Sequence, residues 1–326
     1  MRKTLLGRTG LEISDIAFGG GDTGGILIRG EETACVTTLT RAVKAGINWI
    51  DTAALYGNGA SEEAIGRYIG ALSPRPQIST KVRIERDDMG DLRGAIERSL
   101  TESLKRLRTD HVALFQLHNQ LGEAVGGRPG LPVEDVLARG GVADIFLWLK
   151  QQGLFHASGI TAAGETKACL DVINSGRFDC AQVYYNAINP SAAWKRAPQS
   201  WSAQDFAGIM SACWNQNMGV LAIRVFAGGP LASAKRPEKL AVLTSGTDID
   251  NEMRCAAAVH QALGLNYGTP AQAALRFVLG NRDLASRVIG ISSFLDLNDA
   301  LLAVEQGPLP PAAIAQLKEL WATDFR

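Results

Sequence analysis

The sequence is poor in residues that hold metals or disulfides at regular spacings. It has five cysteines and four histidines in 326 residues, and no C-x-x-C or paired Cys/His motif is present. An odd and dispersed set of thiols argues against a disulfide framework and against a zinc site. We therefore expect no metal, and we expect reduced core thiols at all five positions, which are Cys35, Cys169, Cys180, Cys213 and Cys255.

An excess of one charge and long hydrophobic runs are also missing. The 33 acidic side chains balance the 33 basic ones, so the chain has no broad electrostatic footprint for nucleic acid or for an anionic membrane. No apolar run approaches the roughly 20 residues of a membrane span, and Met1-Arg2-Lys3 is not followed by the apolar stretch of a signal peptide. We therefore expect a cytoplasmic protein whose partner is a small molecule.

A dinucleotide-binding fingerprint is absent as well. Residues 16–18 predict a first buried strand, which runs into the glycines at 19–21. These glycines let a ligand approach the backbone closely. The order Gly-Gly-Gly-Asp-Thr-Gly-Gly nevertheless lacks the G-x-G-x-x-G pattern, and no helix pattern opens directly behind it.

What the sequence does have is a regular alternation of strand and helix patterns. Eight strand–helix pairs, with no linker rich in Pro, Gly or Ser, predict an α/β protein with a single (β/α)8 TIM barrel over residues 1–326. A hairpin over residues 3–14 is expected to plug one end. The predicted strands are 16–18, 47–50, 78–82, 112–117, 157–160, 180–185, 220–223 and 288–291. The predicted helices are 30–46, 64–69, 92–107, 145–149, 168–173, 206–214, 271–279 and 297–304.

Two connections are longer than the others. Residues 119–139 follow the fourth predicted strand and residues 226–250 follow the seventh, so both leave the carboxyl ends of strands, where the active sites of such barrels lie. Long loops at that end are more often binding elements than idle insertions. The first is predicted to be polar and to offer substrate hydroxyls the side chains of Asn119, Gln120, Glu123 and Arg128.

The strand ends carry a candidate acid–base site. The second predicted strand stops at Asp51, and Tyr56 follows in a glycine-bearing loop. A phenol with an ordinary pKa of about 10 needs a nearby cation to transfer protons at neutral pH, and Lys81 near the end of the third strand supplies one. His118 ends the fourth strand, and strand ends converge at one face of a barrel. Each residue also has a purely structural interpretation, in which Asp51 and His118 cap, Tyr56 packs over the loop and Lys81 reaches solvent.

These residues and several further motifs resemble those of the aldo-keto reductase family, and the resemblance covers nearly the whole chain. The matching pieces are residues 6–10, Asp51-Thr52-Ala53 with Tyr56-Gly57, Thr80-Lys81, Leu117-His118, Gln182 with Tyr185-Asn186, residues 228–231, and residues 269–272 with Ala274-Leu275. The resemblance implies a barrel that uses a nicotinamide cofactor without a Rossmann fold, which accounts for the missing fingerprint.

The resemblance also implies roles for the four acid–base residues. Tyr56 would donate the proton to the carbonyl oxygen, Lys81 would lower the pKa of Tyr56, and Asp51 would hold Lys81. His118 would hydrogen-bond the same oxygen and orient the substrate. Two donors aimed at an oxygen that gains negative charge stabilise the transition state more than the ground state.

On the cofactor side the sequence departs from the family pattern. The Ser-Asn pair that the family places after strand five is Thr161-Ala162, and an aromatic residue that many members carry near the end of strand seven aligns with Ile223. The neighbouring Arg224 is expected to lie against the nicotinamide ring, to reach the pyrophosphate, or to face solvent. The implied cofactor-binding residues are Thr161, Gln182, Asn186, Arg224, Gly228, Ser292 and Ser293.

The segment that binds the adenosine phosphate in the family is residues 290–298, and it contains no basic residue. Many members place a basic residue there for the 2′-phosphate. The resemblance to the family still implies NADP(H) as the cofactor, and the missing basic residue makes NAD(H) a serious alternative.

Together these features predict an NAD(P)-dependent oxidoreductase acting on a carbonyl or alcohol. The run 51–62 resembles that of bacterial aldose 1-dehydrogenase-like members, and the polar loop favours a small aldehyde, ketone or aldose. A rival from another class is a nicotinamide-binding regulatory subunit with incidental catalysis, since the family fold also occurs in channel-associated proteins. A metal-dependent barrel hydrolase is a weaker alternative, because the histidines lack ligand spacing.

Overall fold

The computed structural model describes residues 1–123, 130–236 and 244–326, and its centre is a closed barrel of eight parallel strands. Around the barrel the strands follow the order β10-β11-β12-β3-β4-β5-β6-β9. They are β3 (Ile16–Gly19), β4 (Trp49–Asp51), β5 (Gln77–Val82), β6 (Val112–Leu117), β9 (Phe155–Ala162), β10 (Cys180–Tyr184), β11 (Gly219–Ile223) and β12 (Ser286–Gly290). The predicted (β/α)8 barrel and its eight strands are confirmed.

An antiparallel hairpin closes the amino-terminal end of the barrel. It consists of β1 (Lys3–Leu5) and β2 (Glu12–Ser14), joined through the short helix η1 (Gly7–Thr9). Leu6 and Ile13 are fully buried and pack with Trp49 inside the barrel. Gly7 has a φ of 55°, and a Cβ on it would lie 2.2 Å from the backbone nitrogen of Gly219, so only glycine fits this close approach. The predicted hairpin is confirmed, and its apolar side chains fill this end of the barrel.

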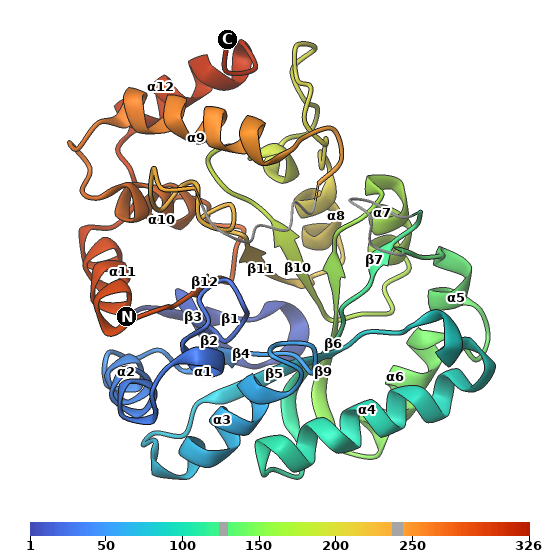
Figure 1. Ribbon diagram of the computed structural model, residues 1–326. Helices are drawn as coiled ribbons and strands as arrows, with labels where there is room; N and C mark the ends of the chain where they lie inside the picture. The colour runs from blue at the N-terminus through green and yellow to red at the C-terminus, as the bar shows by residue number, and fades with distance from the viewer. Residues whose placement is uncertain (124–129, 237–243) are drawn as a thin grey trace.

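The predicted helices surround the strands (Figure 1). They are α2 (Glu32–Lys44), α3 (Ala60–Tyr68), α4 (Leu92–Leu107), α6 (Val142–Gln151), α7 (Thr166–Asn174), α8 (Ile209–Asn215), α10 (Pro270–Leu279) and α11 (Phe294–Gln306). Local sequence sets several of their ends. At α10, for example, Thr269 and Gln272 form a reciprocal capping box and Pro270 occupies the first turn. The apolar faces of the helices bury against the outside of the strands in one large core.

Two long helices are absent from the sequence-based prediction. α9 (Ile249–Leu263) begins where Asp248 accepts a hydrogen bond from the backbone of Asn251, and α12 (Pro311–Ala322) follows α11. The two helices lie together at the top of Figure 1, close to the carboxyl terminus. Further short helices in the described residues include α1 (Ile26–Arg29), η2 (Ile69–Ala71), η3 (Arg86–Asp91) and η4 (Ser191–Ala193).

The segment 119–139 contains more regular structure than the predicted polar loop. β7 (Gln120–Leu121) pairs in parallel with β8 (Gly130–Leu131), and α5 (Val133–Leu137) follows. Leu121 and Leu131 are both buried, so apolar contacts anchor this segment to the barrel. Arg128 lies outside the described residues. The second long connection leads from β11 to α9, and its described part consists mainly of turns.

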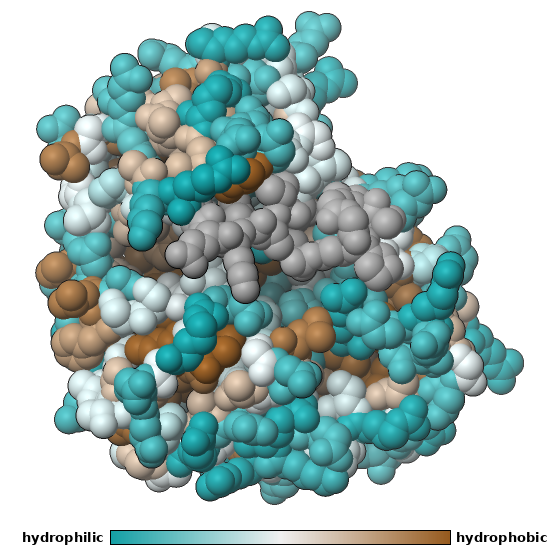
Figure 2. All heavy atoms as spheres, viewed as in Figure 1, coloured by the Kyte–Doolittle hydropathy of each residue, from teal (hydrophilic) through white to brown (hydrophobic). Residues whose placement is uncertain are grey.

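The structure shows how the apolar residues and the five cysteines are distributed between the surface and the interior. Within the three described ranges, no helix is long and apolar enough to cross a membrane. The face shown in Figure 2 is mostly hydrophilic, and its hydrophobic residues form several separate groups. All five cysteines are free and buried, and the described residues contain no cluster of three or more His, Cys, Asp or Glu side chains that could hold a metal ion.

Candidate active site

The four residues predicted as an acid–base site meet at the carboxyl-terminal end of the barrel. Asp51 ends β4, Lys81 lies near the end of β5, His118 follows β6, and Tyr56 lies in the turn before α3. Lys81 Nζ is 2.6 Å from Asp51 Oδ2 and 3.4 Å from Tyr56 Oη. The ring of His118 stands edge-on to that of Tyr56, with 5.5 Å between the ring centroids. Local sequence order and barrel closure together therefore assemble a carboxylate, an ammonium, a phenol and an imidazole.

The Asp51–Lys81 pair is buried and fully hydrogen-bonded. The side chain of Lys81 is 0% exposed and that of Asp51 4%. Lys81 also donates to the carbonyl oxygen of Thr52 at 2.8 Å. The other carboxylate oxygen of Asp51 accepts hydrogen bonds from Ser79 Oγ and from Gln182 Nε2, both at 2.7 Å. These bonds compensate the cost of burying two charges and hold the ammonium in one position.

Two members of this network are missing from the sequence-based prediction. Ser79 donates to Asp51 and accepts from Trp49 Nε1 at 3.0 Å, and Gln116 Nε2 lies 3.4 Å from Asp51. Ser79 stands two residues before Lys81, and Gln116 two residues before His118. Since side chains alternate along a strand, each must face the same side as its strand-end partner. That alternation is the signal that identifies them from sequence.

Burial and charge act on the two protonatable groups in opposite directions. Burial raises the pKa of Tyr56, the Lys81 ammonium lowers it and the Asp51 carboxylate raises it, and the net result is a pKa above the usual value. For Lys81, burial lowers the pKa. Asp51 and Tyr56 raise it by more than burial lowers it, so the pKa of Lys81 lies above its usual value. Lys81 acts on Tyr56 in the expected direction without reversing the effect of burial. Tyr56 is therefore a protonated phenol beside a permanent cation at neutral pH.

Thr161 has a hydroxyl that the protein itself leaves unused. It lies near the end of β9, in register with Gln182 of β10. Its Oγ1 is buried and has no hydrogen-bond partner among the described residues. A buried hydroxyl without a partner is costly, so it fits a ligand group that can donate or accept a hydrogen bond, such as the carboxamide of a nicotinamide.

The two predicted amide residues are engaged within the protein. Gln182 donates to Asp51, as described above. Asn186 accepts from the backbone nitrogens of Ile188 and Asn189 at 3.1 and 2.9 Å, and its Nδ2 donates to the carbonyl oxygen of Arg224 at 2.9 Å. Asn186 therefore ties the turn after β10 to the end of β11. Gly228, also predicted as a cofactor contact, is buried in the next turn with a φ of 80°.

Ser292 and Ser293 lie at the amino terminus of α11. Ser293 caps this helix by accepting a hydrogen bond from the backbone nitrogen of Asp296 at 3.1 Å. The carboxylate of Asp296 in turn accepts hydrogen bonds from the backbone nitrogen of Ser292, at 3.1 Å, and from its hydroxyl. Two donors that an external phosphate could use here, the amide and the hydroxyl of Ser292, are thus already bonded to an internal carboxylate. Like the lack of a basic residue in the segment 290–298, this arrangement is unfavourable for the binding of a phosphate.

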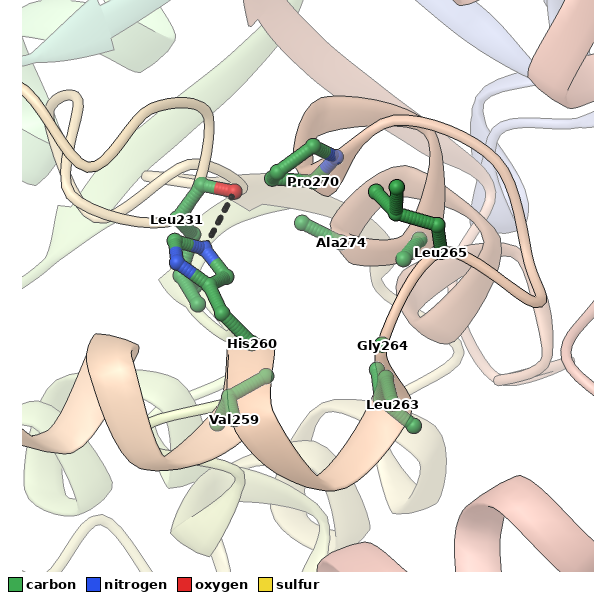
Figure 3. Close-up of a pocket in the computed structure, with 9 residues that line it drawn as sticks. Leu231, Val259, His260, Leu263, Gly264, Leu265, Pro270 and Ala274 are labelled. Atoms are coloured by element: carbon green, nitrogen blue, oxygen red, sulfur yellow. Dashed lines mark hydrogen bonds between the residues drawn. The ribbon is translucent and has the colours of Figure 1, made fainter.

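A small apolar cavity lies apart from the acid–base residues. It has a volume of about 130 Å³ and lies between α9 and α10, beside the turn that ends at Leu231 (Figure 3). His260 Nε2 is 3.4 Å from the carbonyl oxygen of Leu231. Neither Tyr56 nor Lys81 lines this cavity. It therefore belongs to the packing of the turn and the two helices.

Comparisons with known proteins bear on the family and on the fold of this chain. A family model described as the aldo/keto reductase family matches residues 15–322. L-galactose dehydrogenase from Arabidopsis thaliana is 25% identical over 307 residues, which are 92% of this chain and 87% of that protein. The holo form of aldo-keto reductase AKR11C1 from Bacillus halodurans has a TM-score of 0.73 at 22% identity, covering 99% of this chain and 97% of that chain. An aldo/keto reductase from Klebsiella pneumoniae, solved in complex with NADP and acetate, has a TM-score of 0.69 at 18% identity, covering 100% and 98%.

The structural likenesses establish the fold, and the family model covers nearly all of the sequence that builds it. The cofactor implied by the family is a nicotinamide dinucleotide, and the unpartnered hydroxyl of Thr161 fits such a ligand. This chain belongs to the aldo/keto reductase family and is an NAD(P)H-dependent oxidoreductase.

Proposed function

We propose that residues 1–326 form one catalytic domain that transfers hydride between a nicotinamide cofactor and a carbonyl or alcohol carbon, with Tyr56 as the general acid and base. The observation that carries this proposal is the buried relay in which Lys81 Nζ is 2.6 Å from Asp51 and 3.4 Å from Tyr56 Oη. The relay places a fixed cation beside a protonated phenol at the carboxyl-terminal face of the barrel, where such folds carry their chemistry.

In the reducing direction the bound cofactor supplies a hydride to the carbonyl carbon. Tyr56 Oη donates its proton to the carbonyl oxygen as the C=O electron pair moves onto that oxygen, which yields the alcohol. Lys81 stabilises the phenolate that remains, and Asp51 keeps Lys81 charged and in place. His118, edge-on to Tyr56, is the second hydrogen-bonding group for the oxygen. Solvent returns the proton to Tyr56, and alcohol oxidation follows the same steps in reverse.

The remaining predicted residues are proposed to hold the cofactor or to support the residues around it. Thr161 is assigned to the nicotinamide carboxamide because its hydroxyl is buried and unpartnered. Arg224 is assigned to the negatively charged phosphates, and the turn containing Gly228 lies beside it. Gln182 and Asn186 are assigned as supports, through Asp51 and through the backbone of Arg224 respectively.

The adenosine end of the cofactor is assigned to Ser292 and Ser293. Because Asp296 already occupies the donors of Ser292, we propose that NAD(H) competes well with NADP(H).

We propose a small aldehyde, ketone or aldose as the substrate. The likeness to L-galactose dehydrogenase over 92% of this chain supports a sugar-like substrate. Asn119, expected to face the substrate, instead bonds both backbone groups of Ile84, at 2.8 and 2.7 Å. Binding of substrate hydroxyls by this loop therefore depends on Gln120, on Glu123 and on Arg128, which lies outside the described residues. We also propose the cytoplasm as the location, which the five free thiols support.

The rival proposal, a regulatory subunit with incidental catalysis, needs cofactor binding without efficient proton transfer. The complete Asp51–Lys81–Tyr56 relay favours the enzyme, because burying such an ion pair costs stability that binding alone does not require.

The substitution Tyr56→Phe separates these two proposals. It keeps the ring and removes the proton donor, so kcat should fall by about 10²- to 10⁴-fold while the Kd for cofactor stays unchanged. Tyr267→Phe, at a partly buried tyrosine outside the site, is the matched control. Near wild-type kcat of Tyr56→Phe with several carbonyl substrates would refute the assignment.

A further inference from the structure

Ser61, in the first turn of α3, is bonded to both sides of the proposed relay. Its side chain is fully buried. Its Oγ accepts a hydrogen bond from Thr52 Oγ1 at 2.8 Å, and the carbonyl oxygen of Thr52 accepts one from Lys81 Nζ at 2.8 Å. Its backbone nitrogen donates to the carbonyl oxygen of Tyr56 at 3.3 Å. Ser61 thus contacts the residue that carries the phenol and the residue whose carbonyl holds the ammonium.

The carbonyl oxygen of Thr52 is one of three acceptors around the lysine ammonium, which has three N–H donors. Lys81 Nζ is 2.6 Å from Asp51 Oδ2 and 2.8 Å from this carbonyl oxygen. Its contact with Tyr56 Oη is the longest of the three, at 3.4 Å. A hydrogen bond of this length is the first to be lost when the ammonium moves. The position of Thr52 therefore helps to set the distance between the ammonium and the phenol.

The start of α3 is itself tied to the rest of the barrel. The buried carboxylate of Glu62 accepts a hydrogen bond from Thr80 Oγ1 of β5 and another from Arg106 Nε of α4, the latter at 2.7 Å. On the other side, a Cβ on Gly20 would lie 2.6 Å from Ser61 Oγ, so the hydroxyl fits only because residue 20 is glycine. Ser61 Oγ is therefore held in one place, from which it can fix its neighbours.

We propose that Ser61 is a positioning residue that sets the distance between the Lys81 ammonium and the Tyr56 phenol. The inference rests on the proposed function, because this distance matters to catalysis only if Tyr56 transfers the proton. Ser61 acts through the carbonyl oxygen of Thr52 on the ammonium and through its own backbone on Tyr56. Without its hydroxyl, Thr52 is held less firmly, and the ammonium settles towards the charge of Asp51 and away from the neutral phenol.

Ser61→Ala removes the hydroxyl and keeps the backbone bond to Tyr56. At an effective dielectric constant of about 20, moving the ammonium from 3.4 Å to roughly 4 Å from the phenol oxygen shifts the titration of the phenol upwards by about half a pH unit. The rising limb of kcat for alcohol oxidation should move to higher pH by this amount, so kcat on that limb should fall about threefold. The Kd for NADH should stay unchanged.

A matched control separates positioning from stability. Ser286 has a fully buried hydroxyl at the amino-terminal end of the barrel, where it donates to the carbonyl oxygen of Ser14 at 2.7 Å. Ser286→Ala should lower the free energy of unfolding about as much as Ser61→Ala and leave the pH–rate profile unmoved. Thr52→Val removes the partner hydroxyl and should move the limb as Ser61→Ala does. Combining Thr52→Val with Ser61→Ala should move it no further than either change alone.

Three outcomes would overturn the inference. A pH–rate profile of Ser61→Ala equal to that of Ser286→Ala would make Ser61 a structural residue. Shifts of Ser61→Ala and Thr52→Val that add in the double variant would mean that the two hydroxyls act independently. If Ser61→Ala does not fold, an unmoved limb in Thr52→Val refutes the inference instead.

The variant Tyr56→Phe distinguishes these failures from a failure of the proposed function. If Tyr56→Phe keeps its kcat, the proposed function is wrong and the positioning role is wrong with it. If Tyr56→Phe is inactive and the limb of Ser61→Ala has not moved, only the positioning role of Ser61 is refuted.

Discussion

The substitution Asp51→Asn tests the buried ion pair beneath the proposed proton donor. It replaces a carboxylate by a neutral amide of the same shape. Lys81 Nζ is 2.6 Å from Asp51 Oδ2, and the lysine side chain is fully buried. Its other partners, the carbonyl oxygen of Thr52 and the hydroxyl of Tyr56, are neutral. The variant therefore leaves a buried cation without a counterion.

The size of the effect follows from the geometry. Two unit charges 2.6 Å apart attract each other by about 6 kcal/mol at an effective dielectric constant of about 20. Part of this loss is recovered when Lys81 releases its proton and the amide bonds to the neighbouring donors. We therefore expect the free energy of unfolding to fall by about 3–5 kcal/mol at pH 7, the usual result of breaking a buried pair.

The pH dependence distinguishes this mechanism from a loss of packing. In the unmodified protein the pKa of Lys81 is raised above its unfolded value, so its stabilising contribution is complete at neutral pH and is lost only as pH rises through that raised pKa. Asp51→Asn removes the carboxylate that mainly counteracts the effect of burial, so the pKa of Lys81 in the folded variant falls below its unfolded value. The folded variant then favours neutral Lys81, so its stability deficit should grow as pH falls, by up to about 1.4 kcal/mol per pH unit.

Urea unfolding at pH 6 and pH 9 measures both quantities. Asp171→Asn is the control, because it makes the same chemical change at the exposed Lys167–Asp171 pair, where the atoms are 2.7 Å apart. That change should cost less than about 1 kcal/mol. An equal loss in the two variants, or a loss in Asp51→Asn that does not vary with pH, would refute the reasoning.

Three further predictions concern catalysis and specificity. Lys81→Met should lower kcat and move the rising limb of the pH–rate profile for alcohol oxidation to higher pH, because Lys81 lowers the pKa of Tyr56; an unchanged profile would mean that the lysine does not act on the phenol. Asp296→Arg should raise the ratio of kcat/KM for NADPH over NADH by about tenfold or more, since it replaces the carboxylate on Ser292 with a phosphate-binding group; a several-hundred-fold preference for NADPH in the unmodified protein would contradict our reading of this segment. Small hydroxyaldehydes or aldoses should show higher kcat/KM than bulky aromatic carbonyls, and strong turnover of nitrobenzaldehydes with none of any hydroxyaldehyde would argue against the proposed substrate class.

The barrel could be predicted because its signals are local. Apolar runs mark strands buried on both faces, and stripes three or four residues apart mark the covering helices, so eight alternations identify the architecture. α9 and α12 are missed because they fall outside this alternation and pack with each other. The regular structure within 119–139 is missed because its strands are only two residues long, too short for any period to show.

The sequence by itself indicated the four candidate acid–base residues, because Asp51, Lys81 and His118 stand at or next to strand ends, Tyr56 follows one, and barrel closure brings strand ends together. The alternation of side chains along a strand likewise indicates that Ser79 faces the same side as Lys81, and Gln116 the same side as His118. Only the tertiary structure decided the direction in which the pKa of Tyr56 shifts and the engagement of the donors of Ser292 by Asp296. Burial and electrostatic interactions depend on distances through space between residues that the chain brings together only on folding, and no local pattern encodes those distances.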